Sequence, residues 1–220
     1  MSMQIGFVLF PNLTQLDFTG PLQVLHRMPG ATTHILAKTR DPVPSDCGLG
    51  LVPTGTFAEA PQLDLICIPG GLSVVNAMQD EETVGFVARQ AERARWVTSV
   101  CTGAFILGKA GLLKGRKATT HWAYVDLLSL CGAEPTAGRV VRDGNLITAG
   151  GVTSGIDFGL SVLAEVAGPE VAQTVQLGIE YDPDPPFRAG HPSRAPEGVL
   201  AAAKARYAKP REGYRAALGG

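Results

Sequence analysis

The chain passes from a strand pattern directly into a helix pattern at Trp96-Val97-Thr98-Ser99-Val100-Cys101-Thr102-Gly103-Ala104-Phe105-Ile106-Leu107-Gly108. Residues 96–100 favour a buried strand, and the residues from Cys101 onward favour a helix that Gly111 can end. In parallel α/β sheets, functional sites lie at the carboxyl ends of strands. This stretch therefore predicts such a sheet, with Cys101 at its functional edge.

The same alternation of strand and helix patterns extends to both sides of this stretch, which indicates a mostly parallel sheet with helices on both faces. We expect one α/β domain over residues 1–208 and a frayed C-terminal tail over residues 209–220. Gly20-Pro21 should break the helical pattern of residues 12–25 into two pieces. The remaining segments are strands at 4–10, 33–38, 63–69 and 117–120, hairpins at 42–56 and 139–149, and helices at 80–91, 122–130, 153–166, 169–180 and 197–208.

Composition excludes several classes of protein. The 220 residues are 45% hydrophobic and 18% charged, which suits a globular core and excludes wholesale disorder. A net charge of -1 supplies no positive field for nucleic acid or anionic membranes, so we expect neither as a partner. The N-terminal apolar run is too short for a signal peptide or membrane span. Four cysteines without metal-ligand spacing indicate no metal site and a reducing, cytoplasmic compartment.

Ser99-Val100-Cys101-Thr102-Gly103 is similar to the nucleophile elbow G-x-S-x-G, with cysteine in place of the serine. Such a turn exposes the side chain at a helix N-terminus, where the dipole and free N–H groups favour a thiolate. Cys101 is therefore the thiol that we expect to be most reactive, and the N–H of Thr102 would face the anion that forms. The alternative interpretation is a small cysteine buried at the end of a strand.

Three other positions have both a catalytic and a structural interpretation. Glycines in Pro69-Gly70-Gly71 permit close backbone approach, so the Gly71 N–H is either a second oxyanion donor or part of a tight turn. Asp17 lies among apolar neighbours, which would raise its pKa and suit proton transfer, unless it only caps the turn at residues 20–21. His121 is either a base near Cys101 or a helix cap.

Six stretches taken together resemble the ThiJ/PfpI superfamily, and most closely its isocyanide hydratase branch. The resemblance runs from residue 4 to about residue 208, and it also extends to the amidotransferase-like domain of AraC-type regulators. The stretches are Leu16–Pro21, Pro69–Gly71, Val100–Ala104, Ala118–Trp122, Gly150–Asp157 and Glu180–Phe187.

The resemblance implies a flavodoxin-like three-layer sandwich and a homodimer with sites near the interface. It makes Cys101 the nucleophile, Asp17 its carboxylate partner and Thr102 a neighbour that shapes the pocket. The protease-like branch carries histidine directly after the cysteine, and threonine at this position argues against peptidase activity. Further pocket residues are expected at Gly70, His121, Gly150, Val152 and Tyr181.

The implied reaction is the hydration of an isocyanide. Thiolate attack by Cys101, coupled to proton delivery by Asp17, would give a thioimidate, and water would convert this to an N-substituted formamide. No metal or organic cofactor is needed for these steps. The alternatives are another enzyme of the superfamily, with glyoxalase or deglycase activity, and a non-enzymatic redox sensor in which Cys101 is oxidised.

The segment from Asp182 to Pro196 is too rich in proline for regular structure. We expect it to form an ordered arm that lies over the domain or over a partner chain. Its apolar Phe187 has no helical or strand periodicity around it and needs a surface to contact. The arm therefore supports the homodimer that the resemblance implies.

Overall fold

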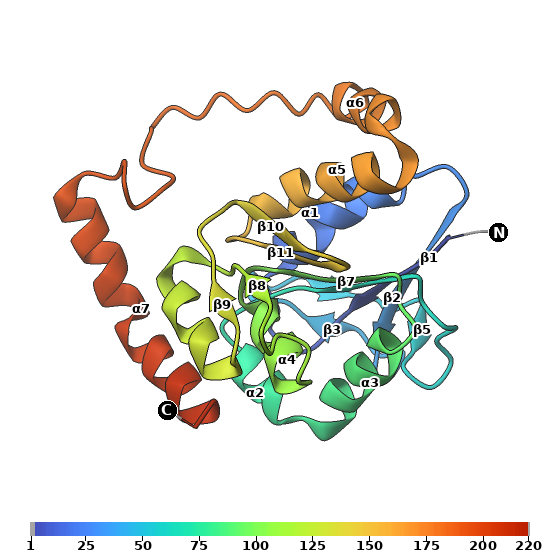
Figure 1. Cartoon of the computed structure of the whole chain (residues 1–220), viewed down its shortest axis with the longest axis horizontal. Coiled ribbons are helices and arrows are strands. Elements are labelled where there is room, and N and C mark those ends of the chain that lie inside the picture. The colour runs from blue at the N-terminus through green and yellow to red at the C-terminus, as the bar shows by residue number, and fades with distance from the viewer. Residues whose placement is uncertain (1–2, 220) are drawn as a thin grey trace.

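A seven-stranded sheet forms the centre of the computed structural model, which describes residues 3–219 (Figure 1). Only β10 runs antiparallel to its neighbour, and every other neighbouring pair in the sheet is parallel. In spatial order the strands are β10 (Val140–Asp143), β11 (Leu146–Ala149), β7 (Trp96–Val100), β6 (Leu65–Ile68), β1 (Met3–Val8), β2 (Ala31–Ala37) and β5 (Gly55–Thr56).

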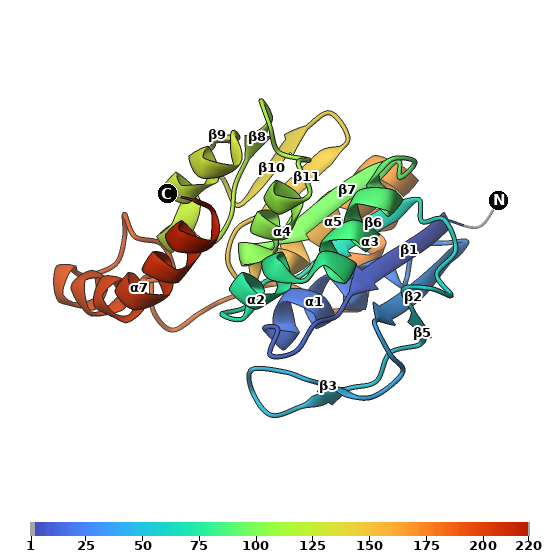
Figure 2. The same cartoon turned by 90° about the horizontal axis from the view of Figure 1, so that it is seen from below.

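Helices cover both faces of this sheet, which confirms the three-layer sandwich expected from the sequence. On one face α1 (Gln15–Leu25) packs beside α5 (Ser154–Ala167), and α6 (Pro169–Gly178) lies outside α5 (Figure 1). The opposite face, seen in Figure 2, carries the helices α2 (Val74–Gln79), α3 (Glu81–Ala91) and α4 (Ala104–Lys109). Beside α4 lies the 3-10 helix η2 (Trp122–Cys131), where the sequence predicted a helix.

Short strands complete the fold. The hairpin of β3 (Val43–Pro44) and β4 (Gly50–Leu51) projects from the body of the molecule (Figure 2). This hairpin and the β10–β11 hairpin were both expected from their turn residues. A small parallel pair joins β8 (Lys117–Ala118) to β9 (Glu134–Pro135). Within the described part of the chain, no helix is both long and apolar enough to cross a membrane.

The helix α1 corrects one expectation, because it continues unbroken through Gly20-Pro21. Pro21 removes one intrahelical hydrogen bond, but it is buried where α1 meets α5. A Cβ at Gly155 of α5 would lie 2.8 Å from the Pro21 ring, so the two helices approach closely here. Burial against α5 outweighs the lost hydrogen bond, and Asp17 is held in the first turn of one continuous helix.

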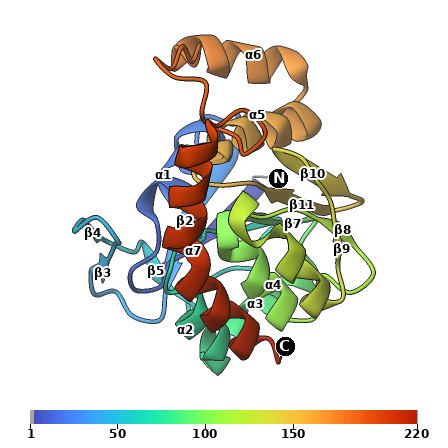
Figure 3. The same cartoon turned by 90° about the vertical axis from the view of Figure 1, so that its left-hand side faces the viewer.

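The C-terminal segment corrects a second expectation, because α7 extends over Glu197–Ala217 where we expected a tail after residue 208. Its second half is anchored to the domain. Tyr214 is buried, and Arg211 donates two hydrogen bonds to the Asp126 carboxylate of η2, at 2.9 and 2.7 Å. Figure 3 shows α7 crossing one side of the domain. Contacts between residues far apart in the sequence therefore order this helix.

Candidate active site

Cys101 lies at a strained turn between β7 and the helices that follow it. A single 3-10 turn, η1 (Cys101–Gly103), separates the strand from α4, and Cys101 has a φ of 56°. This left-handed conformation is unfavourable for a residue with a side chain and is concentrated at functional sites. The backbone is held from both sides, because the Cys101 N–H donates to Gly150 O at 2.9 Å and the Thr120 hydroxyl donates to Cys101 O at 2.6 Å. The predicted nucleophile elbow is confirmed in its geometry.

Gly103 explains why a glycine follows two residues after the cysteine. A Cβ at this position would lie only 2.2 Å from the carbonyl oxygen of Ile68, at the end of the neighbouring strand β6. Any side chain would therefore force the turn away from β6. The glycine lets the carboxyl ends of β6 and β7 meet closely, and this brings Gly70 and Gly71 next to the cysteine turn.

Two backbone N–H groups and one carboxyl group surround the Cys101 sulfur. The N–H groups of Thr102 and Val152 both hydrogen-bond to the sulfur and favour its thiolate form. Val152 has a φ of 27°, so its backbone is also in an uncommon conformation. The carboxyl group is that of Asp17, which shares a hydrogen bond with the thiol. The structure thus places Cys101, Asp17 and Thr102 together, as expected.

Asp17 is fully buried, and its environment opposes ionisation. Burial raises its pKa from 3.8 to about 7, even though hydrogen bonds from Cys101 and Gly70 favour the carboxylate. The Gly70 N–H donates to Asp17 Oδ2 at 3.0 Å, whereas Oδ1 is buried and has no hydrogen-bond partner within residues 3–219. A carboxyl with a pKa near neutrality is suited to accept and return protons.

The sequence left the resting protonation of Cys101 open, and the surroundings of the thiol in the structure determine it. Burial raises the pKa of the Cys101 thiol, and the charge of Asp17 raises it further, whereas the Thr102 and Val152 N–H groups lower it. The short η1 turn supplies less stabilisation than burial removes. Because a charge on either group disfavours a charge on the other, thiol and carboxyl form a coupled pair that retains a proton at neutral pH.

Gly70, Gly71 and Thr102 form the wall beside this pair. A Cβ at Gly70 would lie 2.5 Å from the Thr102 nitrogen and 2.8 Å from Asp17 Oδ2, so only glycine fits between these residues. The Gly71 N–H donates to the Thr102 hydroxyl at 3.0 Å. This bond corrects the expectation for Gly71, because an N–H that is already donated is not a free oxyanion donor. The backbone N–H groups that lower the pKa of the Cys101 thiol are those of Thr102 and Val152.

His121 is part of the site but does not act as a charged group near neutral pH. Burial lowers its pKa to about 4. Its Nδ1 accepts a hydrogen bond from the Ala123 N–H at 3.3 Å, so it caps η2, and the proton of the neutral ring belongs on Nε2. A Cβ at Gly151 would lie 2.5 Å from the imidazole ring, which packs directly against the loop before Val152.

A cavity of about 230 Å³ opens onto the sulfur. Its walls come from η1, η2, the β3–β4 hairpin and, unexpectedly, α7. The lining residues are Thr14, Asp46, Gly71, Leu72, Cys101, Thr102, His121, Tyr124, Val152, Arg206, Tyr207 and Pro210. A cavity of about 500 Å³ beside Lys38 and Asp80 includes none of these residues.

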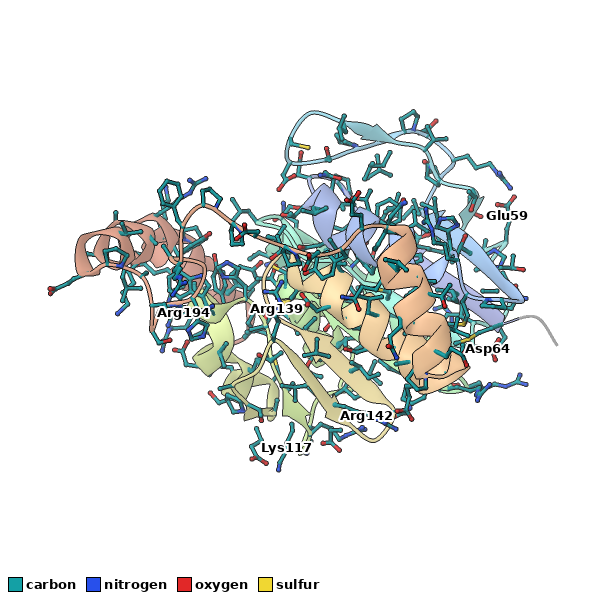
Figure 4. The ribbon with its side chains drawn as sticks, turned by 90° about the horizontal axis from the view of Figure 1, so that it is seen from above. Glu59, Asp64, Lys117, Arg139, Arg142 and Arg194 are labelled. Carbon is teal, nitrogen blue, oxygen red and sulfur yellow. The ribbon has the colours of Figure 1, made fainter. Side chains whose placement is uncertain are left out.

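Three expected pocket residues, Gly70, Gly150 and Tyr181, do not line this cavity. The hydroxyl of Tyr181 donates to Asp157 Oδ2 at 3.1 Å, and Arg139 pairs with the same oxygen at 2.5 Å. Arg139, labelled in Figure 4, also donates to the hydroxyl of Thr153 at 3.1 Å. Tyr181 therefore belongs to a polar cluster that supports the loop after Val152. Gly150 acts through its backbone carbonyl on Cys101, as described above.

Sequence reasoning missed the α7 residues of the cavity, because nothing in the local pattern of residues 206–214 indicates a partner so far away in the chain. It did include Val152, but only through the resemblance and without its role. Among residues 3–219, no group of three or more histidine, cysteine or acidic side chains is arranged to hold a metal ion.

Comparisons with known proteins agree with this geometry. The family model described as DJ-1/PfpI family matches residues 3–165. An isonitrile hydratase from Pseudomonas putida is 54% identical over 208 residues, which cover 94% of this chain and 91% of that protein. The crystal structure of a ThiJ/PfpI family protein from Pseudomonas syringae superimposes with a TM-score of 0.98 at 45% identity, covering 100% of this chain and 92% of that chain.

A more distant structure has the same fold. The crystal structure of DJ-1beta from Drosophila melanogaster superimposes with a TM-score of 0.74 at 25% identity, covering 82% of this chain and 98% of that chain. The family model matches well over half of the sequence, including the cysteine turn and Asp17. The resemblance found in the sequence is confirmed, and the chain belongs to the DJ-1/PfpI family.

Proposed function

We propose that this chain is an isonitrile hydratase, which adds water to an isocyanide and releases an N-substituted formamide. The observation that carries this proposal is the 54% identity, over 94% of the chain, to a protein with that activity. The buried pair of Cys101 and Asp17 at the end of a small cavity supplies suitable chemistry. In this proposal Cys101 is the nucleophile and Asp17 is the general acid and base.

The first step joins the enzyme to the substrate. The Cys101 sulfur forms a bond to the terminal carbon of R–N≡C, and the proton held by the Cys101–Asp17 pair moves to that carbon. The product is the thioimidate R–N=CH–S–Cys101, with Asp17 left as a carboxylate. The Thr102 and Val152 N–H groups stabilise the negative charge on sulfur before the bond forms.

The second step adds water to the thioimidate carbon. Asp17 takes one proton from the water and returns it to the nitrogen, which gives R–NH–CH(OH)–S–Cys101. Asp17 then takes the hydroxyl proton while the carbon–sulfur bond breaks. The formamide R–NH–CHO leaves, and the Cys101–Asp17 pair again holds its single proton. Substrate and water balance the product without any other reagent.

Turnover assays test this proposal directly. Purified protein is incubated with cyclohexyl isocyanide, and in a second reaction with methylglyoxal, and the products are followed by chromatography. We expect N-cyclohexylformamide in the first reaction at a rate proportional to enzyme, and little consumption of methylglyoxal. Rapid loss of methylglyoxal with no formamide would replace the hydratase with a glyoxalase-type activity.

The pH dependence of turnover is a further prediction. The active form of the Cys101–Asp17 pair holds one proton, so activity requires loss of the first of its two protons. Since burial raises the Asp17 pKa to about 7, kcat/KM should rise as pH increases through about 7 and fall about tenfold per pH unit below it. His121, with a pKa of about 4, contributes no step in this range.

The measurement is kcat/KM for cyclohexyl isocyanide between pH 5 and pH 9 in buffers of constant ionic strength. A His121→Gln variant is the control, because glutamine keeps hydrogen-bonding capacity without titrating. Its acid limb should have the same midpoint as the parent enzyme. A kcat/KM that stays constant from pH 9 down to pH 5 would mean that Asp17 ionises as an ordinary exposed carboxyl does.

We propose that the chain forms a homodimer. The extended arm of residues 182–196 and the neighbouring helix α6 present apolar side chains to solvent, with Phe187 78% and Leu177 83% exposed. In a single copy these side chains have little to pack against, and Figure 1 shows α6 as the outermost helix of its layer. A second chain that covers them would account for their exposure.

Light scattering should therefore give twice the chain mass of 23.0 kDa at micromolar concentration. Replacing Phe187 with aspartate should shift the protein toward the monomer, because a charged side chain would enter the interface. A matched change at an exposed polar position of the arm, Arg188→Asp, tests whether added negative charge alone has this effect. A monomer at all concentrations for the parent chain would contradict the proposal.

A further inference from the structure

The helix α7 lies outside the part of the chain that the family model matches, which ends at residue 165. It nevertheless reaches the active site. Arg206, Tyr207 and Pro210 line the cavity at Cys101, and Figure 3 shows α7 passing along the side of the domain where η2 lies. One turn beyond these residues, Tyr214 points inward. This helix therefore provides a candidate for a function that the family pattern does not describe.

Tyr214 is the one α7 residue that is fully buried, with 1% of its surface exposed. Its ring packs against Phe105 of α4 and Tyr124 of η2, with both ring centroids 4.9 Å away. Its hydroxyl donates a hydrogen bond to the carbonyl oxygen of Gly71 at 2.8 Å. A buried tyrosine hydroxyl needs such a partner, and this partner is in the wall of the active site.

The Gly70–Gly71 backbone connects this hydroxyl to the reacting groups. The Gly71 carbonyl also accepts a hydrogen bond from the Thr102 hydroxyl at 3.1 Å, and the Gly71 N–H donates to that hydroxyl at 3.0 Å. On the other side, the Gly70 N–H donates to Asp17 Oδ2 at 3.0 Å. Gly71 has a φ of 148°, in a region open mainly to glycine, so its backbone depends on its hydrogen bonds to stay oriented.

We propose that Tyr214 is a positioning residue for the hydration reaction, because its hydroxyl fixes the Gly70–Gly71 backbone and thereby keeps the Gly70 N–H on the Asp17 carboxylate. Tyr214 does not line the cavity, so it acts on Asp17 through Gly70 and Gly71 and not on the substrate. The kinetic part of this inference rests on the proposed function. The effect on Asp17 itself does not depend on it.

Tyr214→Phe removes the hydroxyl and preserves the ring that packs against Phe105 and Tyr124. The variant is expected to fold, since Gly71 O keeps the Thr102 hydroxyl as a donor. When the Tyr214 hydroxyl no longer donates to Gly71 O, the Gly70–Gly71 backbone is held less firmly and the Gly70 N–H shifts away from Asp17 Oδ2. The hydrogen bond from Gly70, which favours the Asp17 carboxylate, is then weaker. The pKa of Asp17 should therefore rise further.

The expected results are a shift of the acid limb of kcat to higher pH by about 0.5–1 unit and, as its consequence, a fall of about two- to fivefold in kcat at pH 7. KM should change little, because Tyr214 does not contact the cavity. The limb reports the Cys101–Asp17 pair in the presence of its other ionisable neighbours. These are Asp46 on the β3–β4 hairpin, Cys67 on β6, Tyr124 on η2 and Tyr214 itself. Asp46 raises the pKa of Asp17, and the pKa values of Cys67, Tyr124 and Tyr214 are raised by the charge of Asp17 or Cys101.

Asp126→Asn is the matched control. It removes the carboxylate that binds Arg211, so it loosens α7 without changing any bond to Gly71. If α7 acts only by packing, this variant should shift the pH profile as much as Tyr214→Phe does. The proposal predicts that the midpoint for Asp126→Asn stays with the parent enzyme, and an equal shift in the two variants would overturn it.

A second measurement needs no turnover. The rate at which iodoacetamide alkylates Cys101 is followed by mass spectrometry between pH 5 and pH 9, at a temperature where both variants are folded. The lower midpoint of this curve reports the first proton lost from the pair. It should move up in Tyr214→Phe and not in Asp126→Asn. An unchanged midpoint in Tyr214→Phe would overturn the proposal, whatever substrate the enzyme uses.

Discussion

Replacing Cys101 with alanine should abolish formamide formation, with a loss of about 10⁴-fold or more in kcat. The variant keeps the buried pocket and the Asp17 carboxyl but has no atom that can bond to the isocyanide carbon. Chromatographic detection of N-cyclohexylformamide measures the loss. Thermal unfolding of the same preparation shows whether the fold survives removal of the sulfur.

Cys47→Ala is the matched control, since Cys47 is exposed on the β3–β4 hairpin and does not line the cavity. It should keep full activity, and the double variant should behave as Cys101→Ala does. If Cys101→Ala retained a substantial fraction of turnover, covalent catalysis by this residue would be wrong. Water would then have to attack the isocyanide directly.

Asp17→Asn should lower kcat by about 100-fold or more, because asparagine has a similar shape but cannot carry a proton between water, nitrogen and sulfur. Its amide oxygen can still accept the Gly70 N–H. Turnover at pH 8 is the measurement, because the parent pair has lost its first proton there. Near-normal turnover would leave Asp17 with a capping role at the start of α1.

The same variant should also change the free energy of unfolding, and the sign of the change follows from the burial of the Asp17 carboxyl. Its pKa is raised from 3.8 to about 7, so the unfolded chain releases a proton that the folded chain keeps. The stability that the folded chain has with Asp17 protonated is fully present below pH 4, and it is lost as pH rises through about 7. By pH 8 the loss amounts to about 4 kcal/mol at most.

Asparagine has no proton to release, so Asp17→Asn should unfold at a higher temperature than the parent enzyme at pH 8 and at a similar temperature near pH 4. Calorimetry at the two pH values measures this difference. If the variant were less stable than the parent at both values, Asp17 would be mainly a structural residue. Loss of turnover together with a gain in stability at pH 8 is the result that the catalytic assignment requires.

The parts of the fold that sequence reasoning predicted well are those determined by local patterns. The strand at residues 96–100 and its direct passage into a helix follow from apolar residues followed by C-T-G, and the structure has the same elements. The hairpin at residues 140–149 follows from its Asp-Gly-Asn turn. Residue order within a short window carries this information.

The parts that were missed depend on contacts between distant residues. Pro21 fails to break α1 because α5, more than 130 residues later, packs against it. The residues after 208 form a helix because Tyr214 finds Gly71 and Arg211 finds Asp126. No local pattern contains these partners, so propensity alone predicted a break and a tail.

The site shows the same division. Cys101 is identifiable from its turn, and Asp17 from its apolar surroundings, but the sequence does not reveal which N–H groups remain available. The Gly71 N–H already donates to the Thr102 hydroxyl. The second N–H group at the Cys101 sulfur, beside that of Thr102, comes from Val152 on the loop after β11. The sequence also left the resting protonation of Cys101 open, because burial is a property of the assembled core.

The central claim is that hydration proceeds through a covalent bond to Cys101, and rapid-quench mass spectrometry of the enzyme tests it most directly. The enzyme is mixed with excess cyclohexyl isocyanide, quenched in acid within milliseconds, digested and analysed by peptide. Asp17→Asn is run in parallel, because slower water addition should let the thioimidate accumulate. The account predicts that the peptide containing Cys101 gains the mass of one substrate molecule. Formamide produced at full rate with no such adduct on Cys101 in either protein would contradict it.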